Sequence, residues 1–473
     1  MKLNIQDVVE ATQGVLVQKG PAKALTGVST DTRSLVQGNL FIPLVAERDG
    51  HDFIPSATQA GAGAILRTTS HVARSIPPNI HVVEVRDTLR ALGDLAAWWR
   101  AKHHPHCKIV GITGSSGKTT GKEMLSAILS QVAPTWKTSG NFNNLIGLPH
   151  TLFGVREEHQ FVVLEMGMNA FGEIERLTQI AAPDVGWITM ISEAHLEGVG
   201  SLDGVAQAKA ELYHNLPASA TAVVNTEYPR LLQQAASIPQ RKIYTTRLAQ
   251  KPDALGSASS CVCLKEALPL GQEGYKICAH TPFFGEIRFS LPLLGDHQIS
   301  NALGALAVAD ALRVPASAVQ RGFASLKAEG RRMRLIRHPQ GVHLIDDCYN
   351  ANPASMRAAL HTLVQLSEKQ PSVAVLGDMF ELGEHAQDLH AAIGAFAATL
   401  PLSKLLTLGV HSKAVSEAAQ AHGMPQEYIV HCEDIEDCWT QIQALWHTQP
   451  WILVKGSRGM RMERIVEKIE QYG

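Results

Sequence analysis

The chain has 473 residues, 45% of them hydrophobic and 18% charged, a globular composition whose length predicts about three domains. Its formal net charge of −2 gives no electrostatic reason to expect nucleic acid or a membrane surface as a partner, and no apolar run is long enough for membrane insertion. Seven scattered cysteines suit reduced thiols, and the opening stretch MKLNIQDVVEATQG has no apolar signal core, so a cytoplasmic protein is expected.

Residues 1–84 are predicted to form a small α/β domain. The stretch GNLFIPLVA predicts a strand, and FIPSATQAGAGAIL predicts a helix, a turn and a strand. The segment DTLRALGDLAAWWRAKHH then predicts a connecting helix with Leu89, Leu92, Leu95, Trp98 and Trp99 on its apolar side. We interpret the two tryptophans as core residues.

The stretch IVGITGSSGKTT at residues 109–120 predicts a phosphate-binding loop. KIVGIT predicts a buried strand, and KTTGKEMLSAILSQV predicts a helix whose apolar residues run from Met124 to Val132 at helical spacing. A glycine-rich turn there directs backbone N–H groups and the helix N-terminus at an anion, with Lys118 on the phosphates and the Thr119 hydroxyl on Mg²⁺. The strict motif requires glycine at the position of Ile112, so this is a variant loop. An ordinary glycine turn is the less favoured alternative.

The following segments predict a parallel sheet. FVVLEMG, VGWITMI and TAVVN are short β-rich runs separated by helical or loop segments, which is the order of βαβ units. Residues 240–295 predict a hairpin excursion, and LLGDHQISNALGALAVADAL predicts a return to helix. We expect residues 85–313 to form a central ATP-binding domain.

Residues 314–473 predict a third α/β unit. GVHLIDDCYNANPASMRAAL, SVAVLGDMFELGEH, KLLTLGV and WILVKGSRGMRMERIV each place a strand before a polar loop. Ligands of open α/β sheets bind beyond the carboxyl ends of the strands, so these loops are expected to meet substrate. The predicted fold is α/β in three domains: a central parallel sheet of the P-loop type, a small N-terminal α/β domain and a Rossmann-like C-terminal domain.

Polar residues follow several of these strands. Glu165 closes FVVLE, where a carboxylate binds Mg²⁺ or positions water, although a solvated loop acid is the alternative. His195 follows the neighbouring strand and is a ligand candidate, although imidazole is an unusual partner for Mg²⁺. Lys209, from its spacing alone, is interpreted as a solvent-facing helix lysine. Asp346 and Asp347 close GVHLI, where they hold a ribose or a metal, or cap the next helix.

Together the motifs resemble the Mur ligases, ATP-dependent amide-forming enzymes of peptidoglycan precursor synthesis. The resemblance covers the whole chain and rests on STDTRSLVQGNLFIPL, DGHDF, TGSSGKTT, GNFNNLIGLP, LEMGMN, AHLEGVGSLDGVAQAK, HQISNALGALA, DDCYNANPASM, LGDMFELG and VKGSRGMRME. YNANPASM and GDMFELG favour the dipeptide-adding branch over ligases that add D-glutamate, a diamino acid, or glutamate to folate. The resemblance implies UDP-N-acetylmuramoyl-tripeptide and D-alanyl-D-alanine as substrates, ATP and two Mg²⁺ as cofactors, and a monomer.

The resemblance also implies roles for individual residues. The UDP-sugar contacts are Ser29, Thr30, Asp31, Arg33, Asp49, Gly50 and His51. The ATP contacts are Gly114, Ser115, Ser116, Gly117, Lys118, Thr119 and Thr120, with Asn301 near adenine, Asp347 near the ribose and Arg332 near the γ-phosphate. The metal ligands are Thr119, Glu165, His195 and Lys209, the last as a carbamate, which replaces the solvent-facing interpretation. The other substrate contacts are Asn141, Asn143, Asn144, Tyr349, Asn350, Asn352, Lys455, Ser457 and Arg458.

The resemblance implies four catalytic residues: Lys118, Lys209, His195 and Arg332. The sequence also departs from the family pattern at three places, which affects the expected nucleotide contacts. Ala170 stands where the family often has histidine, Gln298 stands where asparagine is common, and EGRRMR leaves Arg331 as an alternative to Arg332.

The implied reaction transfers the γ-phosphate of ATP to a carboxylate, and the dipeptide amine then attacks the acyl phosphate. Closure of the third domain onto the second is expected, because water must be kept from that intermediate. A protein that uses ATP as a binding switch, or a small-molecule kinase, is the alternative from another class.

Overall fold

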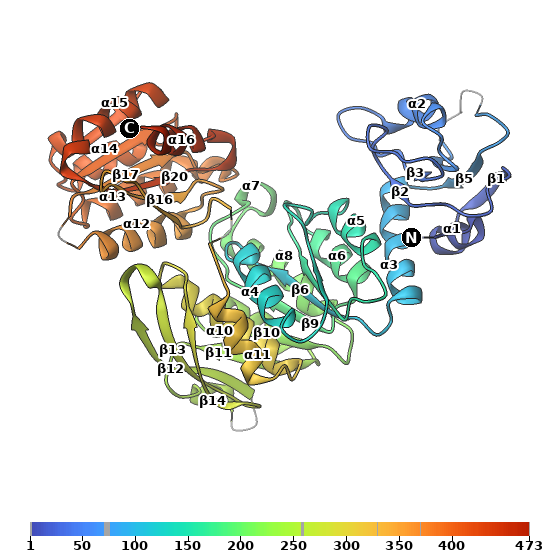
Figure 1. Ribbon diagram of the computed structural model, residues 1–473, viewed down its shortest axis with the longest axis horizontal. Helices are drawn as coiled ribbons and strands as arrows, with labels where there is room; N and C mark the ends of the chain where they lie inside the picture. The colour runs from blue at the N-terminus through green and yellow to red at the C-terminus, as the bar shows by residue number, and fades with distance from the viewer. Residues whose placement is uncertain (1, 71–75, 257–259, 329, 369, 473) are drawn as a thin grey trace.

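The computed structural model describes residues 2–70, 76–256, 260–328, 330–368 and 370–472 (Figure 1). Within these residues three sheets form three α/β units in chain order. The N-terminal unit, in blue, and the C-terminal unit, in orange and red, lie at opposite ends of the molecule, with the central unit between them. The predicted three-domain α/β fold is confirmed. No helix in the described part of the chain has the length and apolar character needed to cross a membrane.

The N-terminal unit is a small sheet with strand order β1-β5-β4-β3-β2, in which β1 is antiparallel to β5 and the other neighbours are parallel. Its elements are α1 (Ile5–Thr12), β1 (Val15–Gln18), β2 (Val28–Ser29), β3 (Leu40–Phe41), η1 (Gly50–Phe53), α2 (Ile54–Gln59), β4 (Ala64–Thr68), β5 (His81–Val85) and α3 (Thr88–His103). The strand expected over GNLFIPLVA covers only Leu40–Phe41. Pro43 follows closely, and proline cannot donate to a strand ladder.

Helix α3 packs in two cores at once. Leu92 and Trp99 are buried in the core of the N-terminal unit, against which Trp98 is partly buried. Ala96, on the same helix, is buried in a core of the central unit. The interpretation of both tryptophans as packing residues is therefore confirmed, and α3 joins the two units as a shared element.

The central unit has the strand order β14-β13-β12-β11-β10-β9-β6-β8-β7 over its described residues. The neighbours from β7 to β12 are parallel, and β12, β13 and β14 form an antiparallel meander that extends the same sheet. Its elements are β6 (Lys108–Thr113), α4 (Lys118–Leu129), β7 (Thr135–Lys137), α5 (Gly147–Phe153), β8 (Phe161–Glu165), α6 (Glu173–Ala181), β9 (Val185–Ile188), α7 (Leu196–Val199), α8 (Leu202–His214), β10 (Thr221–Asn225), α9 (Pro229–Ala236), β11 (Arg241–Thr246), η2 (Asp253–Leu255), β12 (Ser260–Pro269), η3 (Gly271–Glu273), β13 (Tyr275–Thr281), β14 (Gly285–Leu291), α10 (His297–Ala311) and α11 (Ala316–Ala324).

Two hydrophobic cores cover the two faces of this sheet. One contains α4, α10 and α11, and the other contains α6, α8 and α9. Trp187 of β9 lies against α4 and α10, where Cβ atoms added at Gly121 and Gly304 would be 2.6 and 2.2 Å from its ring. Glycine at these two helix positions therefore lets both helices approach the sheet closely.

Two sequence expectations need comment in this unit. Helix α4 ends at Leu129, so Val132 lies beyond it and is 46% exposed rather than part of its apolar face. Phe323 of α11 is buried in the central core, and the next strand begins at Arg334. The domain boundary at residue 313 stays a prediction, and this packing favours a position after α11.

The C-terminal unit has the strand order β15-β16-β20-β17-β18-β19, with β15 antiparallel and the other neighbours parallel. Its elements are β15 (Arg334–Arg337), β16 (His343–Asp347), α12 (Pro353–Ser367), β17 (Ser372–Gly377), η4 (Gly383–His385), α13 (Ala386–Ala398), β18 (Lys404–Leu408), α14 (Lys413–Ala421), η5 (Gln426–Tyr428), β19 (Ile429–Cys432), α15 (Ile435–Leu445), η6 (Trp446–Thr448), β20 (Trp451–Lys455), η7 (Arg458–Met460) and α16 (Glu463–Gln471). Helices cover both faces, as a mostly parallel sheet requires.

Candidate active site

A cleft of about 1420 Å³ is lined by residues of both the central and the C-terminal units. Part of the C-terminal lining comes from the carboxyl ends of β16 and β20 and from the loops after β16, β17 and β20, as the sequence predicted, and the rest comes from α12 and from the segment before β15. The predicted site residues that line it are Ser115, Ser116, Gly117, Lys118, Thr119, Thr120, Asn141, Asn143, Asn144, Glu165, His195, Asn301, Arg332, Asp347, Tyr349, Asn350, Asn352, Lys455, Ser457 and Arg458.

The phosphate loop joins β6 to α4. Gly117 caps α4 with a φ of 83°, and a side chain there would meet the Asn301 Oδ1 atom at 2.5 Å, so glycine is required on both counts. Lys118 Nζ donates a hydrogen bond to the Gly114 carbonyl at 2.6 Å, which folds the lysine back over the loop. Burial and the nearby Arg332 guanidinium lower the pKa of Lys118, while the Glu165 carboxylate opposes this shift. The loop is thus a cationic, N–H-rich anion site.

Glu165 is a buried carboxylate at the end of β8, with 4% of its surface exposed. Its Oε2 accepts a hydrogen bond from the Thr119 hydroxyl at 2.9 Å, and its Oε1 accepts one from the Asn143 amide at 3.0 Å. Its backbone N–H donates to Thr138 Oγ1 at 3.0 Å. These contacts exclude a solvated loop acid and place the carboxylate directly beside the phosphate loop.

Lys122 is a site residue that the sequence reasoning missed. Its side chain is 3% exposed, and its ammonium donates a hydrogen bond to the Thr138 carbonyl at 3.0 Å. The ammonium lies 3.3 Å from Glu123 Oε1 and 3.8 Å from Glu165 Oε2. It therefore compensates the charge of Glu165 inside the protein. Its position one turn after Lys118 on the same helix was the available signal, because residues four apart share a helix face.

Lys209, on α8, is fully buried, so the interpretation from spacing as a solvent-facing lysine is wrong. Its Nζ has no hydrogen-bond partner among the residues that the structure describes. Burial, helped by the charge of Lys118, lowers the pKa of Lys209 well below its ordinary value. A neutral amine without a partner is chemically able to take up carbon dioxide as a carbamate. Lys209 does not line the cleft itself, so a role in the cleft requires that a carbamate group lengthen its side chain.

The described residues supply enough ligands for Mg²⁺ only if phosphates of the bound nucleotide coordinate the same ion. No group of three or more His, Cys, Asp or Glu side chains in the described ranges could hold a metal ion. Mg²⁺ commonly binds through one or two carboxylates together with substrate phosphates and water. Glu165 with the adjoining Thr119 hydroxyl matches that arrangement, and a carbamate on Lys209 would add a second anionic oxygen ligand.

His195 lies at the amino end of α7 and lines the cleft. Its Nδ1 is 2.6 Å from Oε2 of Glu381, which belongs to the loop after β17 in the C-terminal unit. The neighbouring His195 side chain lowers the pKa of Glu381, although partial burial acts to raise that pKa. Sequence reasoning predicted His195 but not this partner.

On the C-terminal side, Asp347 is fixed by two contacts. Its Oδ2 accepts a hydrogen bond from Lys455 Nζ at 2.6 Å, and its Oδ1 accepts one from the Met333 N–H at 3.1 Å. Helix α12 is capped instead by Asn352, whose side chain accepts from the Ser355 N–H at 2.9 Å. The alternative in which Asp347 caps this helix is therefore excluded.

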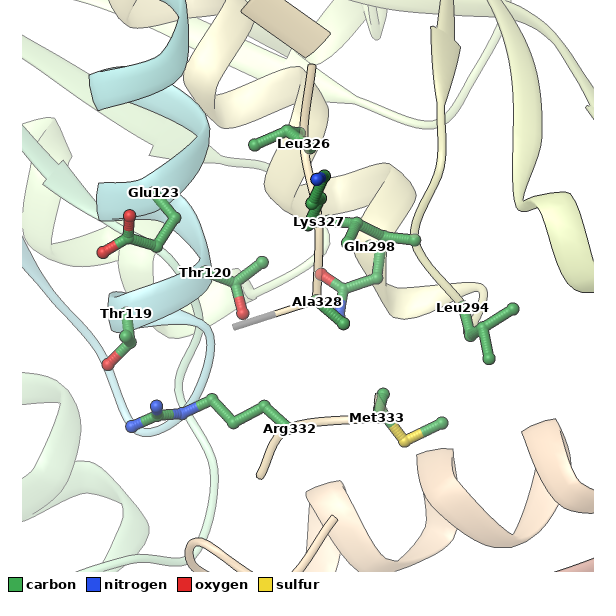
Figure 2. Close-up of a pocket in the computed structure, with 11 residues that line it drawn as sticks. Thr119, Thr120, Glu123, Leu294, Gln298, Leu326, Lys327, Ala328, Arg332 and Met333 are labelled. Carbon is green, nitrogen blue, oxygen red and sulfur yellow. The ribbon is translucent and has the colours of Figure 1, made fainter. Parts of the chain in front are cut away.

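Arg332, not Arg331, lines the cleft. Its guanidinium lies 3.6 Å from the centre of the Tyr349 ring, and Figure 2 shows it extending toward the amino end of α4, below Thr119. Arg331 forms an ion pair with Glu467 at 3.0 Å. A small pocket of about 30 Å³ adjoins the cleft, and Arg332 and Thr119 are among the residues that line it. Figure 2 shows these lining residues.

The predicted UDP-sugar residues lie in the N-terminal unit, outside the set that lines this cleft. Asp31 pairs with Arg33 at 2.6 Å, and this hydrogen bond lowers the pKa of Asp31 to about 2. Thr30 Oγ1 lies 3.1 Å from His150 Nε2 of the central unit. His51 is buried, with Nδ1 2.6 Å from Asp49 Oδ1, so its side chain supports the loop. Their contacts with a UDP-sugar stay a prediction.

Known proteins show similarity over the whole chain. A family described as the Mur ligase middle domain matches residues 112–309, and one described as the Mur ligase, glutamate ligase domain matches residues 331–458. The chain is 35% identical over 472 residues to the UDP-N-acetylmuramoyl-tripeptide–D-alanyl-D-alanine ligase of Bacillus subtilis, covering 99% of this chain and 98% of that protein.

Two solved structures extend this similarity. MurF from Acinetobacter baumannii has a TM-score of 0.89 and 31% identity, covering 100% of this chain and 99% of that one. The MurF ligase from Thermotoga maritima in complex with ADP has a TM-score of 0.80 and 25% identity, covering 94% of this chain and 97% of that one.

Proposed function

The chain belongs to the Mur ligase family, and on that premise we propose that it joins D-alanyl-D-alanine to the terminal carboxylate of UDP-N-acetylmuramoyl-tripeptide at the expense of ATP. The observation that carries this function is the single cleft in which Lys118 and Glu165 of the central unit are brought together with Asp347 and Lys455 of the C-terminal unit. An ATP-driven binding switch would leave the strand-end residues of the C-terminal unit without a purpose. The reaction belongs to peptidoglycan precursor synthesis.

The chemistry explains why a phosphate loop serves amide formation. A carboxylate acylates poorly because its leaving group is oxide, and phosphorylation replaces that leaving group with phosphate. The tripeptide carboxylate attacks the γ-phosphorus of ATP, giving an acyl phosphate and ADP. The amine of D-alanyl-D-alanine then attacks the acyl carbon, and phosphate leaves from the tetrahedral intermediate.

The chain contributes positioning and charge to both steps. The loop N–H groups and the Lys118 ammonium offset the charge of the phosphates, and Arg332 extends toward the same end of α4 to offset charge at the γ-phosphate. Mg²⁺ bound by Thr119 together with the nucleotide, and a second Mg²⁺ bound at Glu165, would supply further charge neutralisation and Lewis acidity. Fixed groups of this kind need no reorganisation during the reaction.

We also propose two Mg²⁺ ions, with Glu165, His195 and a carbamate on Lys209 around the second. The support is the fully buried Lys209 amine, which has no hydrogen-bond partner among the described residues and becomes a satisfied anionic group only after carbamylation and metal binding. Thr119 remains a ligand of the first ion. Uptake of one carbon dioxide on Lys209, seen by solid-state ¹³C NMR with labelled bicarbonate, tests this part.

The three substrates divide among three domains in this proposal. Residues 1–84 hold the UDP-sugar through the segments 29–33 and 49–51, and residues 85–313 hold ATP. Residues 314–473 hold the dipeptide through Tyr349 and the segment 455–458. The cleft that spans the last two units supports the division. A monomer working in the cytoplasm suffices for this scheme, because every proposed contact lies within one chain.

Phosphate release from MgATP by the purified chain tests the function. With UDP-N-acetylmuramoyl-tripeptide present, D-alanyl-D-alanine is compared with D-glutamate, lysine and diaminopimelate as acceptor. We expect release that requires both the nucleotide-tripeptide and the dipeptide, matched by a pentapeptide product in mass spectrometry. Release that is the same with every acceptor, or with none, would contradict the ligase function and favour the nucleotide switch.

A further inference from the structure

Three arginines stand close together at the start of β15, and they have different partners. Arg331 Nη2 donates a hydrogen bond to Glu467 Oε1 at 3.0 Å. Arg334 Nη2 donates one to Glu470 Oε1 at 2.6 Å. Both glutamates belong to α16, which does not line the cleft. Arg332 does line the cleft, and no carboxylate in the part of the chain that the structure describes forms an ion pair with it. Its positive charge is therefore not neutralised by a neighbouring side chain.

Arg332 is held by an aromatic ring instead. Its guanidinium carbon lies over the Tyr349 ring, 3.6 Å from the ring centre, which is a close cation–π contact. A guanidinium carries five N–H donors, all in its own plane. A carboxylate partner would occupy two of them, whereas a ring beneath the guanidinium face occupies none. The contact with Tyr349 therefore restrains the cation and leaves its donors available to an anion.

The backbone on both sides of this contact is fixed by two hydrogen bonds. The Tyr349 N–H donates to the Arg331 carbonyl at 3.1 Å, and the Met333 N–H donates to Asp347 Oδ1 at 3.1 Å. Met333 is buried and has a φ of 53°, a left-handed conformation that the surrounding structure must hold in place. The ring and Arg332 thus come from two chain segments that are tied together immediately beside the contact.

The guanidinium held in this way lies near the phosphate loop. Figure 2 shows Arg332 extending toward the amino end of α4, below Thr119. The charge of Arg332 also contributes to the lowered pKa of Lys118, although burial is the larger cause. Two cations therefore lie close together at the amino end of α4, where an anionic phosphate would be attracted to both.

We propose that Tyr349, besides its proposed contact with the dipeptide, is a positioning residue that holds Arg332 for the γ-phosphate of ATP. This inference rests on the proposed function, in which Arg332 offsets charge at the γ-phosphate. ADP lacks that phosphate, so the ring should affect the binding of ATP and not that of ADP. The enzyme would then distinguish the two nucleotides partly through an aromatic side chain that touches neither of them.

Calorimetric binding of ADP and of a non-hydrolysable ATP analogue to the full chain, with Mg²⁺ and without peptide substrates, tests this role. Tyr349→Leu should weaken binding of the ATP analogue by about 2–30-fold, the range of a cation–π contact, and leave ADP binding unchanged. Tyr349→Phe keeps the ring face and should bind both nucleotides as wild type does. Phe396→Leu is the matched control, because Arg357 lies 5.0 Å from the Phe396 ring centre in the same unit and neither residue lines the cleft.

A double-mutant cycle shows whether Tyr349 acts through Arg332. Arg332→Met should itself weaken binding of the ATP analogue, and adding Tyr349→Leu should cause no further loss, because the group that the ring holds is already gone. A direct contact between Tyr349 and the nucleotide would instead make the two losses add. The KM for D-alanyl-D-alanine, measured separately, reports the proposed contact of Tyr349 with the dipeptide.

The outcomes separate this role from the proposed function. Equal losses of ADP and of the ATP analogue in Tyr349→Leu, or additive losses in the cycle, would overturn the positioning role. Wild-type binding of the analogue by Arg332→Met would overturn it as well. A wild-type chain without dipeptide-dependent phosphate release would refute the ligase function instead. The comparison of the two nucleotides would still decide the role of Tyr349, because it needs neither peptide substrate.

Discussion

Removing either partner of the Asp347–Lys455 ion pair should destabilise the C-terminal unit severely. The two side chains are 12% and 2% exposed, and Lys455 Nζ lies 2.6 Å from Asp347 Oδ2 and donates to the Asn350 carbonyl at 3.0 Å. Asp347→Asn leaves a buried ammonium without its counter-charge, and Lys455→Met leaves a buried carboxylate. Loss of one partner of a buried pair costs about 3–5 kcal/mol.

The double variant supplies the decisive comparison. Because Asp347→Asn with Lys455→Met removes both charges, we expect it to cost less than the sum of the two single losses by well over about 1 kcal/mol. For a domain of this size about 1 kcal/mol shifts Tm by roughly 2–4 °C, so each single variant should lower the transition of the C-terminal unit by about 6–20 °C.

Calorimetry and urea unfolding without nucleotide provide the measurement, because Asp347 is also a predicted ribose contact and bound ATP would mix binding with folding. Losses that add within about 0.5 kcal/mol would refute the coupling. If the coupling holds, a loss of activity in Asp347→Asn reports folding as well as nucleotide binding, and the two must be separated by the unfolding data.

Two further substitutions have expected outcomes of unusual sign. Lys209→Met should raise the free energy of unfolding by about 1–3 kcal/mol in bicarbonate-free buffer, since it removes a buried amine that no described residue hydrogen-bonds. It should also abolish dipeptide-dependent phosphate release. Because the pKa of Lys209 is lowered in the folded state, the unfolded chain binds more protons between that lowered pKa and the ordinary value of 10.5, so wild-type stability should rise with pH across this window. Equal pH slopes of thermal stability in wild type and Lys209→Met would contradict the assignment. Gly304→Ala should lower the free energy of unfolding, measured in urea, by about 1–3 kcal/mol, because the added methyl group would lie 2.2 Å from the Trp187 ring. Replacing glycine by alanine within a helix usually has the opposite, stabilising effect. A gain in stability would show that α10 moves freely.

The fold was predictable where local pattern decides it. KIVGIT and TAVVN correspond residue for residue to β6 and β10, because each is a short β-rich run between helical segments. The end of α4 was predicted three residues too late, at Val132, since an apolar residue after a helix continues the 3.6-residue pattern without being helical. The strand at Leu40–Phe41 was predicted too long because the apolar run continues past Pro43, which cannot donate a hydrogen bond to a neighbouring strand.

The same distinction applies to the candidate site, where local sequence predicts some features and tertiary packing determines the others. Glu165 could be located from its place at the end of a buried strand. The burial of Lys209 could not be predicted, because a lysine on an amphipathic helix carries no local sign that tertiary packing will enclose it. For Lys122 the one signal was its place a single turn after Lys118 on the same helix. The meeting of His195 with Glu381 depends on how two separately folded units dock, and no periodicity within either unit encodes that contact.

Helix α3, which packs in two cores, limits how this protein can be divided. A fragment cut before Thr88 would lack Leu92 and Trp99 and would leave the first sheet without part of its core. A fragment that keeps α3 would instead expose Ala96 and its neighbours to water. The N-terminal unit is therefore unsuited to separate expression or to transplantation onto another ligase. Residues 30–33, which are predicted to contact the UDP-sugar, belong to neither core and are the better place to alter its substrate preference.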